Sequence, residues 1–276
     1  MFKVGLSSCG FQIKSDILAE LKKNGIEHIE VSLHPDAFMD FDYKEAKRLA
    51  DEHGINLWSY HLPFLPFSKI EISVPDKAVR DYSVGLFSEL IKKGADIGID
   101  KYIVHPSGEP ISEAERPERL KYSMQSLNTL AEIAAQNGAV ICVEDLPRTC
   151  ISSNIEDMKT LMSANDKLTV CFDVNHLLKD SHEDFIDAFA DKIVTTHISD
   201  YDFIDERHWL PGEGKIDWQS LVKKLKEVGY NGVWMYELGF DEPKTLKRVR
   251  DLTCEDFATN AKCIFEGKTP PSFVKK

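Results

Sequence analysis

The chain has 276 residues, of which 42% are hydrophobic and 29% are charged, and its formal net charge is −12. This length and composition are typical of a globular protein with one large core rather than of a disordered chain, and no apolar run is long enough to cross a bilayer. The acidic balance disfavours nucleic acid as a partner, because neutralising phosphates requires basic residues gathered on one face.

Segments with the spacing of strands and of helices alternate along the chain. Short apolar runs predict strands at Phe2–Ser8, Ile29–Leu33, Asn56–Leu62, Lys101–His105, Val140–Leu146, Leu168–Val174, Ile193–Ser199 and Val233–Leu238. The amphipathic segments between them predict helices at Asp16–Asn24, Tyr43–His53, Lys77–Ile97, Ala114–Asn137, Ile155–Ala164, Glu183–Ala190, Trp218–Val228 and Lys244–Phe265. Five of these helices are followed directly by a glycine, which is a common residue just after a helix.

Alternating β and α units require a parallel sheet with right-handed crossovers, and eight such units can close on themselves. The sequence therefore predicts a single α/β domain, a (β/α)8 TIM barrel over residues 1–266. The alternative is an open, doubly wound sheet. A dinucleotide-binding sheet of that kind has a glycine-rich turn after its first strand, whereas Ser7–Phe11 lacks the G-x-G-x-x-G pattern. Residues 267–276 are expected to form a frayed C-terminal tail.

The six cysteines form no C-x-x-C pair, and Cys142 and Cys171 lie inside apolar runs. This pattern is typical of free thiols in a reducing compartment. The N-terminal residues lack the pattern of a signal peptide. We therefore expect a cytoplasmic protein without membrane contacts. The sequence leaves the oligomeric state open, a homo-oligomer included.

Ionisable residues interrupt the last four predicted strands near their C-terminal ends. They are Glu144, Asp173, His197 and Glu237. Catalytic residues of such barrels stand at this end of the strands, and strand residues alternate between the barrel interior and the helix layer. Each residue alone could be a hydrogen-bonded strand end. Four at the same depth in consecutive strands favour a common site.

Three carboxylates that meet at a barrel mouth repel one another, and buried charge without a partner is very unfavourable. One divalent metal ion, bound by the four residues, is the simplest source of compensating charge. Three residues with oxygen donors and one imidazole suit Mn²⁺, Mg²⁺ or Zn²⁺, and the hard oxygen donors favour Mn²⁺.

Further polar side chains are expected around the same mouth. His61 and His105 end the third and fourth predicted strands, His176 follows Asp173 by three residues, and Arg207 and His208 lie in the loop after the seventh strand. Loops on a rigid barrel are where binding residues are found, so we predict that these five contact the substrate. Taken singly, each histidine could equally be structural. The same loop ends at Asp217, a predicted helix N-cap.

The chain resembles the xylose isomerase-like TIM barrels, the sugar phosphate isomerase/epimerase group. The similar motifs occur in the family's order: Val143–Asp145, Phe172–His176, Thr196–Asp200, Leu210–Asp217 and Tyr236–Leu238. The resemblance implies that Glu144, Asp173, His197 and Glu237 bind the metal ion, and that the two glutamates move protons. It also implies that His176 and Arg207 touch the substrate.

One segment departs from this family pattern. The ketohexose 3-epimerase branch has a further glutamate shortly after the metal ligand of the fifth strand. This chain has Leu146–Cys150 there, without a glutamate. The departure argues against ketohexose epimerisation in particular.

These features predict a metal-dependent isomerase or epimerase in carbohydrate metabolism. Its substrate would be a small sugar, sugar phosphate or polyol, converted by proton transfer next to a carbonyl through an enediolate. Glu144 and Glu237 come from strands three apart in an eight-strand ring, so one can remove a proton and the other return it from the opposite side. A dehydratase of a keto-polyol would use the same chemistry.

A zinc phosphodiesterase like endonuclease IV, acting on abasic DNA, is an alternative from another reaction class. His61, His105, His176 and Glu206–His208 resemble the additional zinc ligands of that enzyme, with Glu206 in place of an aspartate. The acidic net charge and the lack of a loop rich in Lys and Arg argue against it. A barrel that binds metal without activity is a further alternative.

Overall fold

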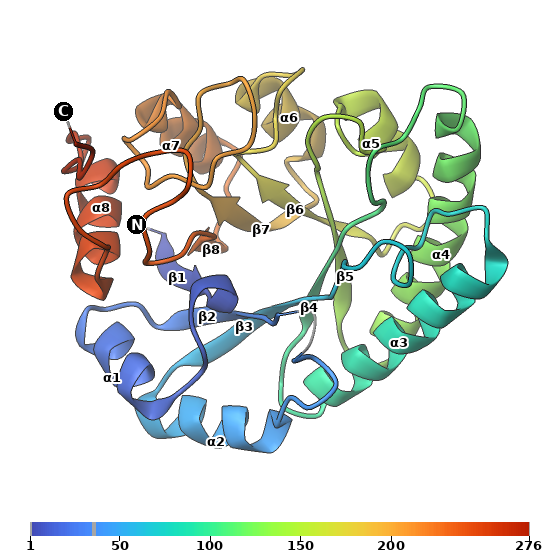
Figure 1. Ribbon diagram of the computed structural model, residues 1–276, viewed down its shortest axis with the longest axis horizontal. Helices are drawn as coiled ribbons and strands as arrows, with labels where there is room; N and C mark the ends of the chain where they lie inside the picture. Colours follow the sequence, from blue (N-terminus) through green and yellow to red (C-terminus); the bar gives the residue numbers. More distant parts are fainter. Residues whose placement is uncertain (1, 35–36, 276) are drawn as a thin grey trace.

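The strands of the barrel pair in chain order, from β1 with β2 to β7 with β8, and β8 pairs with β1 to close the ring. All of these pairings are parallel. The computed structural model describes residues 2–34 and 37–275. In these residues the helices surround the strands (Figure 1). The predicted (β/α)8 barrel is confirmed.

The strands are β1 (Lys3–Ser7), β2 (His28–Ser32), β3 (Asn56–His61), β4 (Lys101–Val104), β5 (Val140–Glu144), β6 (Thr169–Asp173), β7 (Ile193–Ile198) and β8 (Val233–Tyr236). The helices are η1 (Ser8–Gly10), α1 (Ser15–Lys23), α2 (Tyr43–His53), α3 (Lys77–Ala95), α4 (Arg116–Gln136), α5 (Ile155–Met162), α6 (His182–Phe189), α7 (Trp218–Glu227) and α8 (Cys254–Phe265).

Local chemistry accounts for the helix ends. The predicted N-cap Asp217 accepts hydrogen bonds from the backbone N–H groups of Gln219 and Ser220 at the start of α7. Gly54 follows α2 with a φ of 63°, a left-handed conformation that glycine adopts without steric cost. Such caps set where each helix stops and where the next strand begins.

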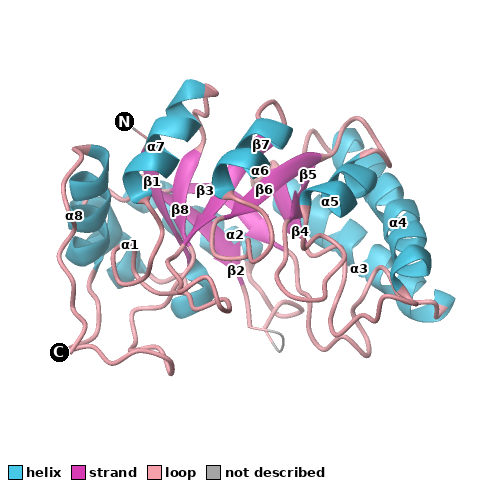
Figure 2. Ribbon diagram, turned by 90° about the horizontal axis from the view of Figure 1, so that it is seen from above, coloured by secondary structure: helices cyan, strands magenta, loops and turns pink. Residues whose placement is uncertain are grey.

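Strand register places the ionisable strand ends side by side. Asp173 on β6 is the Cα partner of His197 on β7, and Glu144 on β5 is the partner of Cys171, two residues before Asp173. The longer loops gather at this end of the barrel (Figure 2). A functional site is therefore built from strand ends and the loops that follow them.

The last helix begins later than predicted, at Cys254 rather than Lys244. Thr253 forms a capping box with Asp256, which fixes this start. In the preceding segment, the backbone N–H of Val249 donates to the carbonyl of Phe273, outside any helix. The apolar spacing of residues 246–252 reflects packing of a loop, because its backbone bonds go to other segments.

The C-terminal tail is held along this loop instead of fraying. The N–H of Lys275 donates to the carbonyl of Lys247 at 2.8 Å, and Arg248 and Val274 form an antiparallel bridge. The six cysteines are free thiols. Within residues 2–34 and 37–275, every helix is too short or too polar to pass through a membrane.

Asp200 clamps the loop between β7 and α7. Its buried carboxylate accepts hydrogen bonds from the backbone N–H groups of Tyr201, Gly212 and Ile216 and from the indole N–H of Trp218, at 2.7–3.2 Å. Four donors on one carboxylate fold the loop back on the end of β7. The motif Leu210–Asp217 thus has a structural role in this protein.

We expect Asp200→Ala to lower the free energy of unfolding by about 2–4 kcal/mol, because four buried donors lose their acceptor. The matched control is Asp217→Ala, which removes an exposed helix cap and should cost about 1 kcal/mol. Urea denaturation followed by circular dichroism measures both. A loss for Asp200→Ala no larger than that of the control would contradict the clamp.

Candidate metal centre

The four residues predicted to bind metal meet at the carboxyl end of the barrel. Glu144 and Asp173 are the last residues of β5 and β6, His197 lies in β7, and Glu237 directly follows β8. Glu144, Asp173 and His197 are at most 1% exposed, and the Glu237 side chain is 12% exposed. Among these four residues the most exposed side chain is therefore that of Glu237, and the other three are closed off within the barrel.

One nitrogen of His197 faces all three carboxylates. Its Nδ1 lies 3.0 Å from Oε1 of Glu144, 3.3 Å from Oε2 of Glu237 and 3.8 Å from Oδ2 of Asp173. These distances suit groups arranged around one small cation, which the residues of the strand ends could bind together.

Two carboxylate oxygens support this interpretation. Oε2 of Glu144 and Oδ2 of Asp173 are buried and accept no well-aligned hydrogen bond from the described residues, although imidazole nitrogens of His105 and His176 lie 3.0 and 3.4 Å from them. Buried polar atoms in proteins are nearly always hydrogen-bonded, so unsatisfied carboxylate oxygens in the same cluster point to a missing positive partner. A divalent ion fits the donors that are present.

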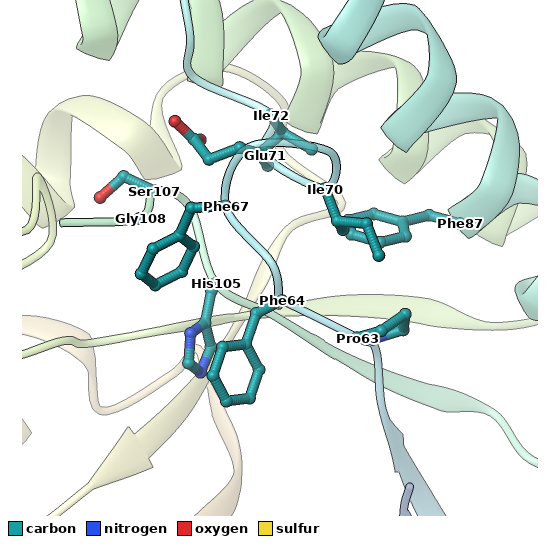
Figure 3. Close-up of a pocket in the computed structure, with 10 residues that line it drawn as sticks. All are labelled: Pro63, Phe64, Phe67, Ile70, Glu71, Ile72, Phe87, His105, Ser107 and Gly108. Atoms are coloured by element: carbon teal, nitrogen blue, oxygen red, sulfur yellow. The ribbon is translucent and has the colours of Figure 1, made fainter. Parts of the chain in front are cut away.

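His61 and His105 approach the same cluster from β3 and from the end of β4. Their Nε2 atoms lie 3.3 Å and 3.0 Å from Oε2 of Glu144. His61, Glu144, His197 and Glu237 form a group whose ligand atoms lie within 4.8 Å of one another, whereas Asp173 belongs to a group with Glu144 and His176. The ring of Phe64 stacks on His105 at 4.2 Å between ring centroids (Figure 3), which fixes the plane of that imidazole.

A second group of candidate ligands consists of His176, Glu206 and His208, whose ligand atoms all lie within 4.8 Å of one another. Nε2 of His176 lies 3.3 Å from Oε2 of Glu206. The guanidinium of Arg148 approaches Glu206 at 3.4 Å and also pairs with Glu109. Arg148 also bonds Asp205, so Glu206 shares this one guanidinium with two other carboxylates. His176 also belongs to a third group with Glu144 and Asp173.

Arg207 is turned toward its own loop. Its Nε donates to Oδ2 of Asp202 at 2.9 Å, and its backbone N–H donates to the side-chain oxygen of Asn175. It does not line the cleft beside the metal centre. Arg207 therefore needs a side-chain rearrangement before it can take the predicted role in substrate binding.

The charges of the cluster are strongly coupled. Burial, together with repulsion from Glu144 and Asp173, raises the pKa of Glu237 to about 8. Burial alone would also raise the pKa of Glu144, but His197 and His105 hold it well below its usual range. Although burial opposes it, Glu144 raises the pKa of His61 to about 9. When no ion is bound, protons held by these groups offset the negative charge of the carboxylates.

Glu30 is a member of this cluster that the strand-end argument missed. It lies in the middle of β2, is fully buried, and its Oε2 is 3.1 Å from Nε2 of His197. The sequence does carry a signal, since Glu30 stands between Ile29 and Val31 in a strand with no other carboxylate. A charged residue inside a buried strand is rare unless it is paired.

A cleft of about 1040 Å³ opens beside the centre. This volume is typical of a site for a small molecule. His61, His208 and Glu237 form the wall nearest the ligands, and aromatic rings, among them Phe11 and Phe64, form other walls. Asp40 and Asp42 also line the cleft, and none of its described lining residues is Lys or Arg.

Comparison with known proteins gives a match to a protein-family model described as "Xylose isomerase-like TIM barrel", over residues 18–253. An uncharacterized protein of Methanocaldococcus jannaschii is 27% identical over 179 residues, 61% of this chain and 60% of that protein. A second protein of that organism is matched over 50% of its length. The chain thus spans about half to three fifths of these two relatives.

Two relatives with named activities also match. D-psicose 3-epimerase of Ruminiclostridium cellulolyticum is 24% identical over 256 residues, 86% of this chain and 83% of that protein. A "Probable endonuclease 4" of Finegoldia magna is 28% identical over 164 residues, 53% of this chain and 57% of that protein. A solved structure of L-ribulose 3-epimerase has a TM-score of 0.78 at 20% identity, covering 96% of this chain and 94% of that one, which shows a shared fold.

We expect the metal-free protein to take up one Mn²⁺ per chain, and Asp173→Asn to weaken this binding at least 100-fold. The substitution replaces an ionised oxygen ligand with a neutral amide of the same shape. Isothermal titration measures both proteins. Glu71→Gln is the control, because Glu71 is a buried carboxylate bound to Arg119 and Ser73. Equal binding by Asp173→Asn and wild type would refute the assignment of Asp173.

Proposed function

Because the chain belongs to the xylose isomerase-like TIM barrel family, we propose that it is a metal-dependent isomerase or epimerase of a small, neutral carbohydrate. The observation that carries the proposal is the convergence of Glu144, Asp173, His197 and Glu237 beside a cleft of suitable size. The match to D-psicose 3-epimerase over most of both chains supports the class of reaction and of substrate.

The donor set fits a divalent ion, since an imidazole nitrogen and three carboxylates face one another and two buried carboxylate oxygens lack a well-aligned hydrogen bond. When bound, the ion supplies positive charge that stabilises the negative charge developing on substrate oxygens. Glu144, Asp173, His197 and Glu237 would hold it. We favour Mn²⁺, with Zn²⁺ and Mg²⁺ as the other candidates, because most donors are hard oxygens.

The glutamates of β5 and β8 are the proposed proton carriers. Glu237 lines the cleft, and the more deeply buried Glu144 contacts the same Nδ1 of His197. One carboxylate removes the proton from the carbon next to the substrate carbonyl, and the other returns a proton to the opposite face. Each transfer contributes roughly 10²–10⁴-fold to the rate. His61 and His208, which also line the cleft, are placed to bind substrate hydroxyls.

The charge of the cleft supports a substrate without phosphate. Phosphate sites in proteins use Arg, Lys or helix N-termini. The described lining of the cleft includes Asp40, Asp42 and Glu237 but no Lys or Arg. The arginines of the neighbouring loops, Arg148 and Arg207, are engaged with carboxylates. A dianionic phosphate in this cleft would meet repulsion without compensation.

A zinc phosphodiesterase acting on abasic DNA is the second candidate. The group of His176, Glu206 and His208 favours it, as does the similarity to a "Probable endonuclease 4". Two observations weigh against it. The guanidinium of Arg148 lies 3.4 Å from Glu206 and would repel a cation bound there, and a chain of net charge −12 is poorly suited to phosphate contacts.

With Mn²⁺ bound, we expect the protein to catalyse exchange of a carbon-bound hydrogen for deuterium in neutral ketoses or keto-polyols dissolved in D₂O. Proton NMR of the substrate follows the exchange. Glu237→Gln, assayed at saturating Mn²⁺, should reduce it at least 100-fold, because the amide cannot accept the proton. Glu71→Gln should retain the wild-type rate. Lack of exchange over a broad panel of neutral substrates would contradict the proposal.

The phosphate ester of the best substrate provides a further control on the cleft. Its kcat/KM should be at least tenfold lower than that of the neutral compound, owing to repulsion by the acidic lining. A higher kcat/KM for the ester would show that the charge argument is wrong.

His105→Ala separates the two candidate functions. For an isomerase, we expect the bound Mn²⁺ to remain and turnover to fall, because His105 contacts Glu144 without belonging to the four predicted ligands. Wild-type protein with Zn²⁺ should not incise a duplex with an abasic site at physiological salt. Gel analysis of a labelled duplex measures incision. Robust incision by wild type that is lost in His105→Ala would establish the phosphodiesterase instead.

A further inference from the structure

Glu30 occupies an unusual position for a carboxylate. It lies in β2 and is fully buried, while the ring of strands places β8 and β1 between β7 and β2. Its contact with His197 of β7 therefore crosses the interior of the barrel. Removing a carboxylate from water is strongly unfavourable unless it gains a good partner, so the identity of its partners matters.

The partners of Glu30 are few and specific. Its Oε2 accepts a hydrogen bond from Oγ of Ser59 at 2.8 Å and lies 3.1 Å from Nε2 of His197. In the described part of the chain, its other oxygen, Oε1, has no hydrogen-bond partner. The interaction with His197 is the one that links Glu30 to the metal centre.

His197 is held between two sets of carboxylates through its two ring nitrogens. Nε2 faces Glu30, and Nδ1 faces Glu144 and Glu237 at 3.0 and 3.3 Å. An ionised carboxylate can only accept hydrogen bonds, so the contact at Nε2 requires a hydrogen on that nitrogen. Nδ1 also faces carboxylates and carries a hydrogen while no ion is bound, but it is the nitrogen beside all three predicted carboxylate ligands, so it is the one that can give up its hydrogen and offer a lone pair to an ion.

We propose that Glu30 is a positioning residue: it accepts the Nε2 hydrogen of His197 and thereby directs the Nδ1 lone pair at the metal centre. The inference rests on the metal ion of the proposed function, but it concerns a bond that exists within the chain itself. A carboxylate behind a metal-bound histidine fixes the ring and increases its basicity, and losing it lowers metal affinity 10–100-fold in other proteins.

The test compares wild type with Glu30→Gln, which keeps the shape of the side chain and removes its charge. Isothermal titration with Mn²⁺ should show a 10–100-fold higher Kd for Glu30→Gln. Glu71→Gln, another buried carboxylate that contacts Arg119 and Ser73, should bind Mn²⁺ as wild type does. Circular dichroism of each variant establishes that it is folded. If Glu30→Gln does not fold, Ser59→Ala, which removes the other hydrogen bond of Glu30, replaces it and should raise the Kd by a smaller factor.

A spectroscopic measurement examines the bond directly. In protein labelled with ¹⁵N-histidine, the Nε2–H proton of His197 should resonate far downfield, because it is bonded to a buried carboxylate. The His197→Asn variant assigns the signal. The resonance should move upfield in Glu30→Gln, or in Ser59→Ala if that variant is used, and remain in place in Glu71→Gln. This experiment uses metal-free protein, so it does not depend on the proposed function.

The outcomes are distinct. A folded Glu30→Gln with wild-type Mn²⁺ affinity, or a wild-type His197 without a hydrogen on Nε2, would overturn the role of Glu30. If wild type itself binds no Mn²⁺, the proposed function fails, and the resonance then decides the inference. A shift of the Nε2–H resonance in Glu30→Gln would uphold the hydrogen bond between Glu30 and His197. Absence of that resonance from wild type would refute this bond.

Discussion

Mutual repulsion among carboxylates buried at one end of the barrel is the constraint on which the site depends. Glu30, Glu144 and Asp173 are almost completely inaccessible to water, and Glu237 is nearly so. Such charges persist in a folded protein only when positive partners stand close to them. The histidines that contact these carboxylates supply part of the positive charge, and the bound ion that we propose would supply the remainder. The position of His197 at the centre of the carboxylates follows from this requirement.

The rest of the fold holds these groups at short range against their repulsion. Register between β6 and β7 pairs Asp173 directly with His197. The loop that follows β7 is fixed by Asp200 and by a buried ion pair between Arg248 and Glu213. This loop carries Glu206 and His208 to the mouth. The rigid barrel therefore pre-organises the site, as catalysis by positioned groups demands.

Much of this arrangement could be predicted from sequence, because the strands are short apolar runs bounded by glycine-capped helices. The strand ends Glu144, Asp173 and His197 followed directly from that pattern. Glu30 could not be found in this way, since its partner lies on a distant strand and only the closed barrel brings them together. The start of α8 was mispredicted because a packed loop had helix-like apolar spacing. The engagement of Arg207 with Asp202 depends on a loop conformation that no local pattern specifies.

We propose that a single ion is bound among the four strand-end residues and none in the group of His176, Glu206 and His208, where Arg148 lies 3.4 Å from Glu206. Anomalous diffraction from crystals soaked in Mn²⁺ tests this most directly. We predict one strong anomalous peak, bounded by Glu144, Asp173, His197 and Glu237. No peak at that position, or additional peaks of equal height beside His176 and Glu206, would contradict the account.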